Sequence, residues 1–401
     1  MSVAMPQPTT FLNDCALVCA LGHERAAITQ RLLVDGVSGL TVSDAWSIGR
    51  PLPLGRVTAA LPSVDHLPLR LRSRNNQLAL AALAQIRPAL DAAIAQYGAA
   101  RVGVVLGTST SGVSAAETAL AKELHTGALP ADFHYGQQEM GSCAEVVARE
   151  LGVSGPAYVH SSACSSSAKA LASAARLIRM GLCDAVVTGG VDTLCGFTVA
   201  GFSALESVSG ARCNPLSANR NGVNLGEAAA LFLMSRSPAI VALCGWGESS
   251  DGHHMSAPDP EGGGARIAMT EALRRAGIDA SSIDYINLHG TATPQNDAME
   301  SRAVVALFGA QVAVSSTKPF TGHTLGAAGA VEAAFCWLAM QDENPEGCLP
   351  PHLWDGVPDP ALPVLNVVAH GARLGRPIRY ALSNSFAFGG SNASLVFGRV
   401  S

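Results

Sequence analysis

Three short segments of this 401-residue chain carry residue types that could do chemistry. The first, VHSSACSSSAK, places Cys164 among small residues where an expected strand ends and an expected helix over residues 166–179 begins. Small neighbours leave the sulfur approachable, and a helix N-terminus favours a thiolate and an adjacent oxyanion. Taken alone, Cys164 could equally be a packing residue, which is the usual fate of a cysteine.

The other two segments carry histidines at similar strand-to-helix junctions. LHGTATPQND places His289 at the carboxyl end of an expected strand, where α/β sheets bind ligands. KPFTGHTLGAAGAVE places Lys318 and His323 at the mouth of an alanine-rich helix, with Glu332 further along it. A single histidine of this kind is more often a buried side chain with its hydrogen bonds made within the core. Three junctions that carry Cys, His and Lys/His residues favour a catalytic role. A thiolate that holds an acyl group, two neutral imidazoles and a nearby cation suit carbon–carbon bond formation from a thioester.

The elements that must position these residues alternate along the chain. Short β-branched runs predict strands at 102–106, 185–187, 284–288 and 312–315, and alanine-rich stretches predict helices at 77–96, 145–151, 166–179, 266–276 and 327–341. This alternation is typical of a mostly parallel α/β architecture. Repeated Gly-Thr and Gly-Gly pairs after strands indicate two related halves that face one another. Polar and proline residues near 235–239 predict a boundary that divides the chain into residues 1–237 and 238–401.

Composition excludes several classes of protein. Hydrophobic residues make up 48% and charged residues 14%, which excludes intrinsic disorder. A net charge of −5 without a lysine-rich run argues against nucleic-acid binding. No run reaches the roughly 18 apolar residues of a membrane-spanning helix, and the N-terminus lacks the pattern of a signal peptide. We therefore expect a cytoplasmic protein without membrane insertion, with its ten cysteines reduced and, since no Cys/His set has zinc spacing, without a metal site.

In their order and wording, the three segments resemble those of the β-ketoacyl-acyl carrier protein synthases, the elongating condensing enzymes of the thiolase superfamily. SACSSS matches the nucleophile motif, HGTATP the first histidine motif and KPFTGHTLGAAGAVE the lysine and second histidine motif. NSFAFGGSN near the C-terminus matches the glycine-rich gating loop, so the resemblance covers nearly the whole chain. It implies a duplicated thiolase-like α/β fold of five layers, αβαβα, with two mixed sheets.

The resemblance also implies roles for the residues of the three segments. Cys164 would accept the growing acyl chain from acyl carrier protein. His289 and His323 would bind the thioester carbonyl of malonyl-acyl carrier protein, assist its decarboxylation and stabilise the enolate, which attacks the Cys164 thioester in a Claisen condensation. Lys318 would organise charge around His323, with Glu332 beside it. The substrates are carried on the phosphopantetheine of the carrier protein, and no further cofactor is required.

Two loops resemble the gates of this family. The FAFGG loop contains Phe386, Phe388 and Gly389, and the segment DGHHMS begins at Asp251. The backbone N–H groups of Cys164 and Phe388 would form the oxyanion hole. This chain departs from the common pattern at Ala387, where glycine is usual, and at Ser391, where threonine is usual. Some relatives hold a monovalent cation, and the resemblance leaves open such an ion at the positions that match Asn287, Glu332, Ser383 and Asn384.

The partners follow from the same resemblance. Because acyl carrier protein is acidic, we expect it to dock on basic residues; the candidates are Arg70, Arg72, Arg74 and Arg212. The acyl pocket is expected near Thr108 and near Phe133 and Gln137 of a second subunit, since relatives are homodimers. A heterodimer with a related subunit stays open. The polar Gln137 segment and the wording NPLSANRNGVNLGEAAALFL resemble condensing enzymes of bacterial aryl polyene clusters, with fatty-acid elongation as the rival.

Two alternatives belong to other classes. A thiolase that uses coenzyme A would carry a second reactive cysteine near the C-terminus, but no cysteine follows Cys348. A non-catalytic subunit resembling a chain-length factor would typically lack the nucleophile, whereas Cys164 is present with both histidines.

Overall fold

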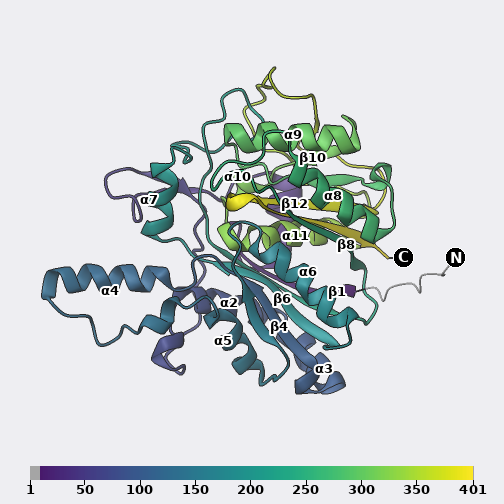
Figure 1. Cartoon of the computed structure of the whole chain (residues 1–401). Coiled ribbons are helices and arrows are strands. Elements are labelled where there is room, and N and C mark those ends of the chain that lie inside the picture. The colour runs from purple at the N-terminus through teal and green to yellow at the C-terminus, as the bar shows by residue number, and fades with distance from the viewer. Residues whose placement is uncertain (1–9, 401) are drawn as a thin grey trace.

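The computed structural model describes residues 10–400 and shows layers of helices alternating with layers of strands (Figure 1). The strands are β1 (Thr10–Val18), β2 (Thr41–Ser43), β3 (Leu52–Leu54), β4 (Val102–Gly107), β5 (Ala157–His160), β6 (Ala185–Asp192), β7 (Ala228–Ser235), β8 (Val241–Ser250), β9 (Tyr285–Asn287), β10 (Ala313–Ser315), β11 (Asn366–Val367), β12 (Tyr380–Ala387) and β13 (Ser391–Arg399). The helices are α1 (Arg25–Thr29), α2 (Arg74–Gln85), α3 (Arg87–Tyr97), α4 (Val113–Thr126), α5 (Ser142–Leu151), α6 (Ser166–Arg179), α7 (Gly196–Ala204), α8 (Gly263–Ala276), α9 (Pro294–Phe308), α10 (Lys318–Thr321) and α11 (Ala328–Ala339).

The strand order repeats within the chain. The first half runs β5-β4-β6-β7-β1, and the second runs β10-β9-β12-β13-β8 with β11 added outside β10. In each half the third, second and fourth strands are parallel, and the fifth and first follow antiparallel. Both halves therefore share one mixed topology, which is the duplication that the repeated Gly-Thr and Gly-Gly pairs suggested.

A short pairing joins the two halves. Thr10 pairs with Leu243 and Phe11 with Ala242, so β1 and β8 are neighbours and the described residues form one sheet of eleven strands. The expected pair of mixed sheets is thus continuous at this edge, because β1 offers β8 a free edge at its first two residues. The predicted boundary at residue 237 lies between β7 and β8; the division into domains stays a prediction.

The helices form three layers around the two layers of strands. Helices α6 and α11 lie in the middle, in contact with each other and with strands of both halves. Helix α8 covers β8 and β13 on one outer face, and α2 and α5 cover β1, β4, β5 and β7 on the other (Figure 1). Every residue of α11 is buried, which explains why this helix is apolar on all sides except at Glu332. The expected αβαβα layering is present.

One predicted helix is wrong as a single element. The stretch 77–96 forms two helices, α2 and α3, bent by 76° at Ile86. Pro88 lies in the first turn of α3, where its missing N–H is tolerated, whereas the same residue would interrupt a continuous helix. Within residues 10–400, no single helix is long and apolar enough to cross a membrane; this bent pair alone reaches the required length and composition.

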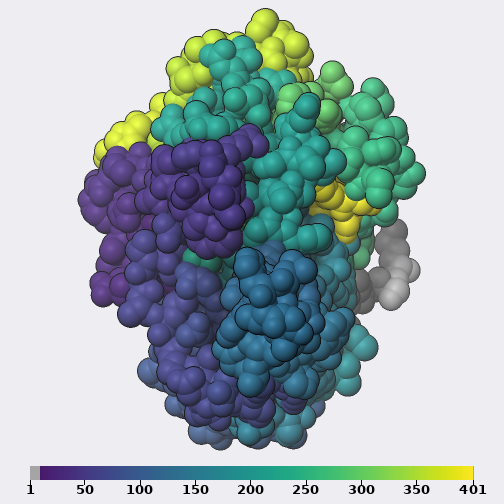
Figure 2. All heavy atoms as spheres, turned by 90° about the vertical axis from the view of Figure 1, so that its left-hand side faces the viewer, coloured from purple at the N-terminus to yellow at the C-terminus, as the bar shows by residue number. Residues whose placement is uncertain are grey.

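Helix α4 and the chain up to residue 141 project from one side of the molecule (Figures 1 and 2). Ala116 and Ala119 are the buried residues of α4, whereas Leu120 and Leu124, one turn apart, are exposed. A helix with exposed leucines on one face offers an apolar surface to a partner.

Candidate active site

The nucleophile candidate sits on a tight turn between β5 and α6. Ala163 has a φ of 49°, in the left-handed region, and Cys164 follows it directly before the N-cap residue Ser165. The hydroxyl of Ser166 accepts a hydrogen bond from the Ser162 N–H and donates one to the Ala163 carbonyl. These small polar residues shape the turn, and Cys164 is 5% exposed at its end.

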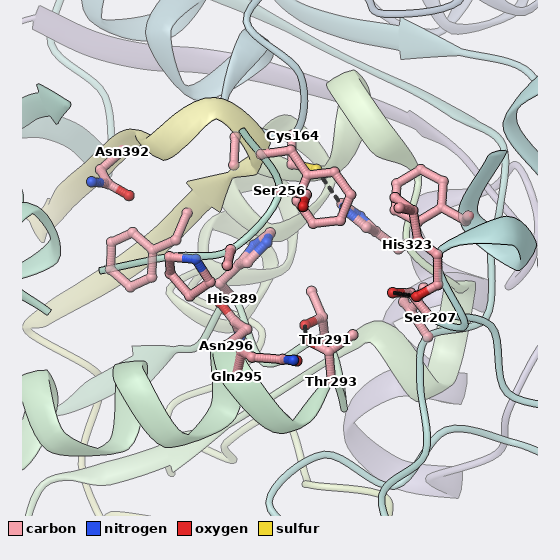
Figure 3. Close-up of a pocket in the computed structure, with 18 of the residues that line it drawn as sticks. Cys164, Ser207, Ser256, His289, Thr291, Thr293, Gln295, Asn296, His323 and Asn392 are labelled. Carbon is pink, nitrogen blue, oxygen red and sulfur yellow. Dashed lines mark hydrogen bonds between the residues drawn. The ribbon is translucent and has the colours of Figure 1, made fainter. Parts of the chain in front are cut away.

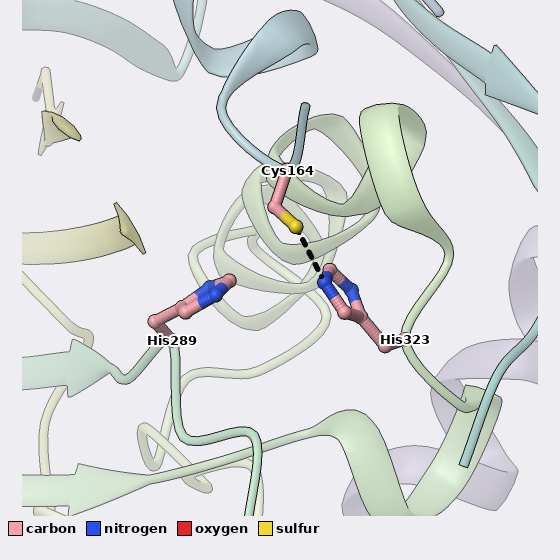
Figure 4. A group of neighbouring side chains, drawn as sticks. All are labelled: Cys164, His289 and His323. Carbon is pink, nitrogen blue, oxygen red and sulfur yellow. Dashed lines mark hydrogen bonds between the residues drawn. The ribbon is translucent and has the colours of Figure 1, made fainter. Parts of the chain in front are cut away.

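Three segments that are distant in the sequence bring Cys164, His289 and His323 together. The Nε2 atom of His323 lies 2.9 Å from the Cys164 sulfur. The two imidazole rings are 5.4 Å apart between centroids and nearly perpendicular, at 85°. All three side chains are buried, and Figure 4 shows the sulfur pointing between the two rings. The convergence expected from the sequence is therefore present.

Backbone contacts fix the segment that carries His323. Its N–H donates to the Asn224 carbonyl at 2.6 Å, and its carbonyl accepts from the Gly226 N–H at 2.9 Å. The preceding Gly322 has a φ of 72°, and a Cβ there would come within 2.6 Å of the Leu225 carbonyl oxygen. Only glycine fits this close approach, so the glycine before the histidine is a structural requirement.

A buried carboxylate holds the His289 turn. Glu300 on α9 accepts hydrogen bonds from the His289 N–H at 2.8 Å and the Gly290 N–H at 2.7 Å. Burial raises the pKa of Glu300 to about 7, against the effect of these backbone donors. Sequence reasoning missed this residue, although an acidic residue on the helix that follows the HGT turn was a usable signal.

Lys318 and Glu332 form a buried ion pair beside the histidines. Their Nζ and Oε1 atoms are 2.5 Å apart, and both side chains are almost fully buried. We expected Lys318 to lie beside His323, but its Nζ lies 3.5 Å from Nδ1 of His289, and the lysine contacts this histidine instead. An ammonium can only donate, so it fixes the His289 proton on Nε2. The Lys318 charge still lowers the pKa of both histidines.

Burial keeps the side chains of Cys164, His289 and His323 uncharged before substrate binds. It raises the pKa of the Cys164 thiol to about 12, although Lys318 and the Phe388 N–H act in the opposite direction. Burial, followed by the Lys318 charge, holds the pKa of His289 and His323 well below the ordinary value. At neutral pH the site therefore contains a thiol and two neutral imidazoles, and a thiolate must form as the substrate arrives.

A cavity opens in front of the sulfur (Figure 3). Part of its wall is polar, and Thr291 and Thr293, which hydrogen bond to each other at 2.8 Å, lie on this part. Aromatic and aliphatic side chains form the rest of the lining: Phe202, Leu205, Val223, Phe386 and Phe388. The cavity suits a slender ligand with both polar and apolar stretches.

The two predicted gating loops are in contact. Phe388 stacks on Phe202 with ring centroids 5.3 Å apart. The Asp251 N–H donates to the Gly390 carbonyl at 2.9 Å, and the Asp251 carboxylate accepts from Asn392 Nδ2 at 2.7 Å. A Cβ on Gly390, which has a φ of 70°, would collide with Asp251. These contacts hold the Phe388 turn over the cavity.

Thr108, Phe133 and Gln137 of the same chain do not line this cavity. The expected acyl pocket includes Phe133 and Gln137 of a second subunit, so it stays a prediction. Thr108 donates its hydroxyl proton to Asp192 at 2.6 Å. The Gln137 side chain accepts a hydrogen bond from the His134 N–H and donates one to the Arg72 carbonyl, so its amide has partners within its own chain. Phe133 lies on the projecting segment after α4.

Three of the four arginines expected to dock a carrier protein already have partners. Arg70 forms an exposed pair with Glu145. Arg72 donates to two backbone carbonyls, and Arg74 binds the buried Glu227 through two nitrogens. Arg212 is exposed, and no ion pair is recorded for it within residues 10–400. It precedes Cys213, whose N–H donates to Asn224 beside the His323 segment.

Asp192, at the end of β6, was also missed by sequence reasoning. Its carboxylate accepts from the N–H and hydroxyl groups of Ser109 and Thr110 and from the Gly326 N–H. One buried acidic side chain thus ties the loop after β4 to the turn that follows His323.

The expected cation positions contain two unsatisfied oxygens. Glu332 Oε2 and Ser383 Oγ are buried and have no hydrogen-bond partner among the described residues. Ser383 pairs with Asn287 across β12 and β9. Buried oxygens without donors fit an oxygen-ligated monovalent cation, which stays a proposal. The Cys164, His289 and His323 ligand atoms also lie within 4.8 Å of one another, a spacing that a metal ion or a thioester carbonyl could share.

Comparison with known proteins identifies the class. Residues 57–239 match the beta-ketoacyl synthase N-terminal domain, and residues 240–353 match the beta-ketoacyl synthase C-terminal domain. The chain therefore belongs to the beta-ketoacyl synthase family of thiolase-like condensing enzymes. Its activity is that of a β-ketoacyl-acyl carrier protein synthase, an acyltransferase of fatty acid or polyketide biosynthesis. This assignment sets aside a coenzyme A thiolase, and the presence of Cys164 beside His289 and His323 argues against a non-catalytic subunit.

Individual relatives agree with this assignment. Nodulation protein E of Rhizobium meliloti (strain 1021) is 34% identical over 362 residues, which cover 86% of this chain and 88% of the relative. The 3-oxoacyl-[acyl-carrier-protein] synthase 2 of Vibrio cholerae is 34% identical over 325 residues, covering 76% and 77%. Among solved structures, the ketosynthase ApeO in complex with its chain length factor ApeC from Xenorhabdus doucetiae has a TM-score of 0.92 and 42% identity, covering 99% of this chain and all of that one.

Proposed function

We propose that Cys164 holds the growing acyl chain while His289 and His323 activate the malonyl unit. The distance of 2.9 Å between the Cys164 sulfur and His323 Nε2, at the end of a cavity, carries this proposal. No other described cysteine lines this cavity beside a histidine. The two steps of the reaction can be assigned to particular atoms.

In the first step the sulfur attacks the thioester of acyl-acyl carrier protein. His323 Nε2 accepts the thiol proton as the carbon–sulfur bond to Cys164 forms. The N–H groups of Cys164 and Phe388 stabilise the oxyanion, since the Phe388 N–H already lies against the sulfur. The bond to the phosphopantetheine sulfur then breaks, and this leaving thiolate takes the proton from His323.

In the second step the malonyl thioester carbonyl accepts a hydrogen bond from Nε2 of His289, whose proton Lys318 fixes there. Nδ1 of His323 has no partner among the described residues, so nothing fixes its tautomer, and Nε2 can donate as well. The bond to the carboxylate breaks, CO2 leaves, and its electron pair forms the enolate. The enolate carbon attacks the Cys164 thioester, the bond between the acyl carbon and the sulfur breaks, and the released Cys164 thiolate takes up a proton from solvent.

We further propose that the carrier's phosphopantetheine enters through the cavity, with its polar groups along Thr291 and Thr293. The carrier protein would dock near Arg212, which is exposed and close to the His323 segment, whereas Arg74 is bound to Glu227. Arg70 and Arg72 would need to leave their present partners. A cytoplasmic location belongs to the same proposal.

A related subunit is proposed as the partner. ApeO, 42% identical, was solved with a chain length factor, and this chain keeps the nucleophile and both histidines. The projecting α4, with Leu120 and Leu124 exposed, offers an apolar contact for such a subunit. A homodimer is the alternative. The similarity to ApeO also supports the aryl polyene subtype.

Intact-mass measurement after incubation with acyl-acyl carrier protein tests the nucleophile. The wild type should gain the mass of one acyl group and Cys164→Ala none, while Cys164→Ala keeps malonyl decarboxylation, which uses the histidines. Cys348→Ala, at a partly exposed thiol away from the cavity, should acylate as the wild type does. An equal adduct on Cys164→Ala would contradict the proposal.

A further inference from the structure

Two side chains of α6 bind the strand that follows the gating turn. The hydroxyl oxygen of Ser391, the first residue of β13, accepts a hydrogen bond from Lys169 Nζ at 2.6 Å and one from Ser165 Oγ at 3.1 Å. Ser165 follows Cys164 directly, and Lys169 lies one helical turn further along α6. Ser391 comes immediately after the turn Phe388–Gly390. The helix that presents the nucleophile thus also holds the end of the gating turn.

Backbone hydrogen bonds hold the opposite side of the turn, together with the stack of Phe388 on Phe202. The Gly389 N–H donates to the Met255 carbonyl at 2.9 Å, and the Gly390 carbonyl accepts from the Asp251 N–H. Phe388 lies between these two sets of contacts, with its N–H against the Cys164 sulfur. The contacts of Ser391 with α6 are therefore one of the sets of contacts that set the position of this N–H relative to the sulfur.

Lys169 is an unusual residue at this place. It is half-buried, and the structure records no carboxylate partner for it within residues 10–400, although a partly buried ammonium without a counterion is unfavourable. Burial and the nearby Arg176 lower its pKa. The chain has lysine only at positions 122, 169 and 318, so a cation here is not a general feature of its composition. Stability alone does not explain Lys169.

We propose that Lys169 is a positioning residue for acyl transfer: through Ser391 it holds the Phe388 N–H against the Cys164 sulfur and keeps the gating turn closed. This inference rests on the proposed role of the Phe388 N–H in the oxyanion hole. Removing one oxyanion donor typically lowers a rate about 10²- to 10³-fold, which sets the upper limit of the effect.

Lys169→Met removes the donor and keeps the length of the side chain. We expect acylation of Cys164 by acyl-acyl carrier protein, measured by rapid quench and intact mass, to slow at least about tenfold at saturating substrate, within the limit above. The KM should stay within about twofold, because the substrate does not contact Lys169. Malonyl decarboxylation should stay at the wild-type rate, since it depends on the histidines. Lys169→Arg should restore most of the rate, and Lys122→Met, at an exposed position of α4, should behave as the wild type.

A second variant separates positioning from a general loss of stability. Ser391→Ala should reproduce the slow acylation, and combining it with Lys169→Met should add little, because both changes break the same contact. Acylation at the wild-type rate in Lys169→Met, or losses that multiply in the double variant, would overturn the inference. If acylation and decarboxylation fall together with the melting temperature, Lys169 is merely structural. A wild type that forms no Cys164 adduct would instead refute the proposed function.

Discussion

The buried pair of Lys318 and Glu332 allows stability and catalysis to be separated. Lys318→Met leaves the Glu332 carboxylate buried without its counterion, and breaking a pair in this way typically costs about 3–5 kcal/mol of the free energy of unfolding. The same variant removes the donor to Nδ1 of His289. A hydrogen bond to a charged group contributes about 1.5–3 kcal/mol, so decarboxylation should slow about 10- to 100-fold.

The informative variant is Lys318→Met combined with Glu332→Met. Replacing both members of a buried ion pair by apolar residues is often neutral, so the free energy of unfolding should return to within about 1 kcal/mol of the wild type. The decarboxylation rate should stay low, because nothing then fixes the His289 proton on Nε2. Urea denaturation and release of CO2 from malonyl-acyl carrier protein measure the two effects. Recovery of both in the double variant would show that Lys318 serves only as the counterion of Glu332.

Further predictions concern the gate and the buried carboxylate of Glu300. Phe388→Ala removes the stack on Phe202, so iodoacetamide should label Cys164 faster than in the wild type; an unchanged labelling rate would show that the ring does not restrict access. Folding raises the pKa of Glu300 from 4.5 to about 7, so its contribution to stability is full below pH 4.5 and is lost as the pH rises through 7. That loss amounts to about 3 kcal/mol, since each pKa unit corresponds to about 1.4 kcal/mol. Glu300→Gln should therefore lose less in melting temperature than the wild type between pH 5 and pH 8, and parallel curves would contradict this pKa. Above pH 7 the wild-type carboxylate accepts from both the His289 and the Gly290 N–H, whereas the amide turns an N–H group toward one of them, so the decarboxylation rate of Glu300→Gln should fall below that of the wild type there.

Local patterns were enough to predict the main elements. The alternation of β-branched and alanine-rich runs predicted α6 with its bounds and β4, β6, β9 and β10 within a few residues. These patterns arise because the buried face of each strand or helix carries apolar side chains at regular intervals along the sequence. The prediction of one helix over 77–96 was wrong, because Pro88 cannot continue a helix and instead lies in the first turn of a new one.

Some residues of the site could be predicted from the sequence and others could not. The sequence predicted Cys164, His289, His323 and Lys318, because each lies in a motif of small residues at a strand-to-helix junction. The sequence did not predict Glu300 or Asp192. Glu300 accepts a hydrogen bond from the backbone of the turn that precedes its helix, and Asp192 accepts one from the backbone of a loop that is distant in the sequence. A carboxylate on a helix looks the same in the sequence whether it faces solvent or a buried N–H.

The sequence by itself determined the identity of the reacting groups and the layered class of the fold, because residue type and periodicity are local properties. Tertiary structure alone decided which groups touch. It places Lys318 beside His289 and not beside His323. It also pairs Arg74 with Glu227 and hydrogen bonds Lys169 to Ser391. The first two pairings join distant segments within one half of the chain, and the third joins the two halves. Separations of a few ångströms between such distant segments leave no periodic pattern in the sequence.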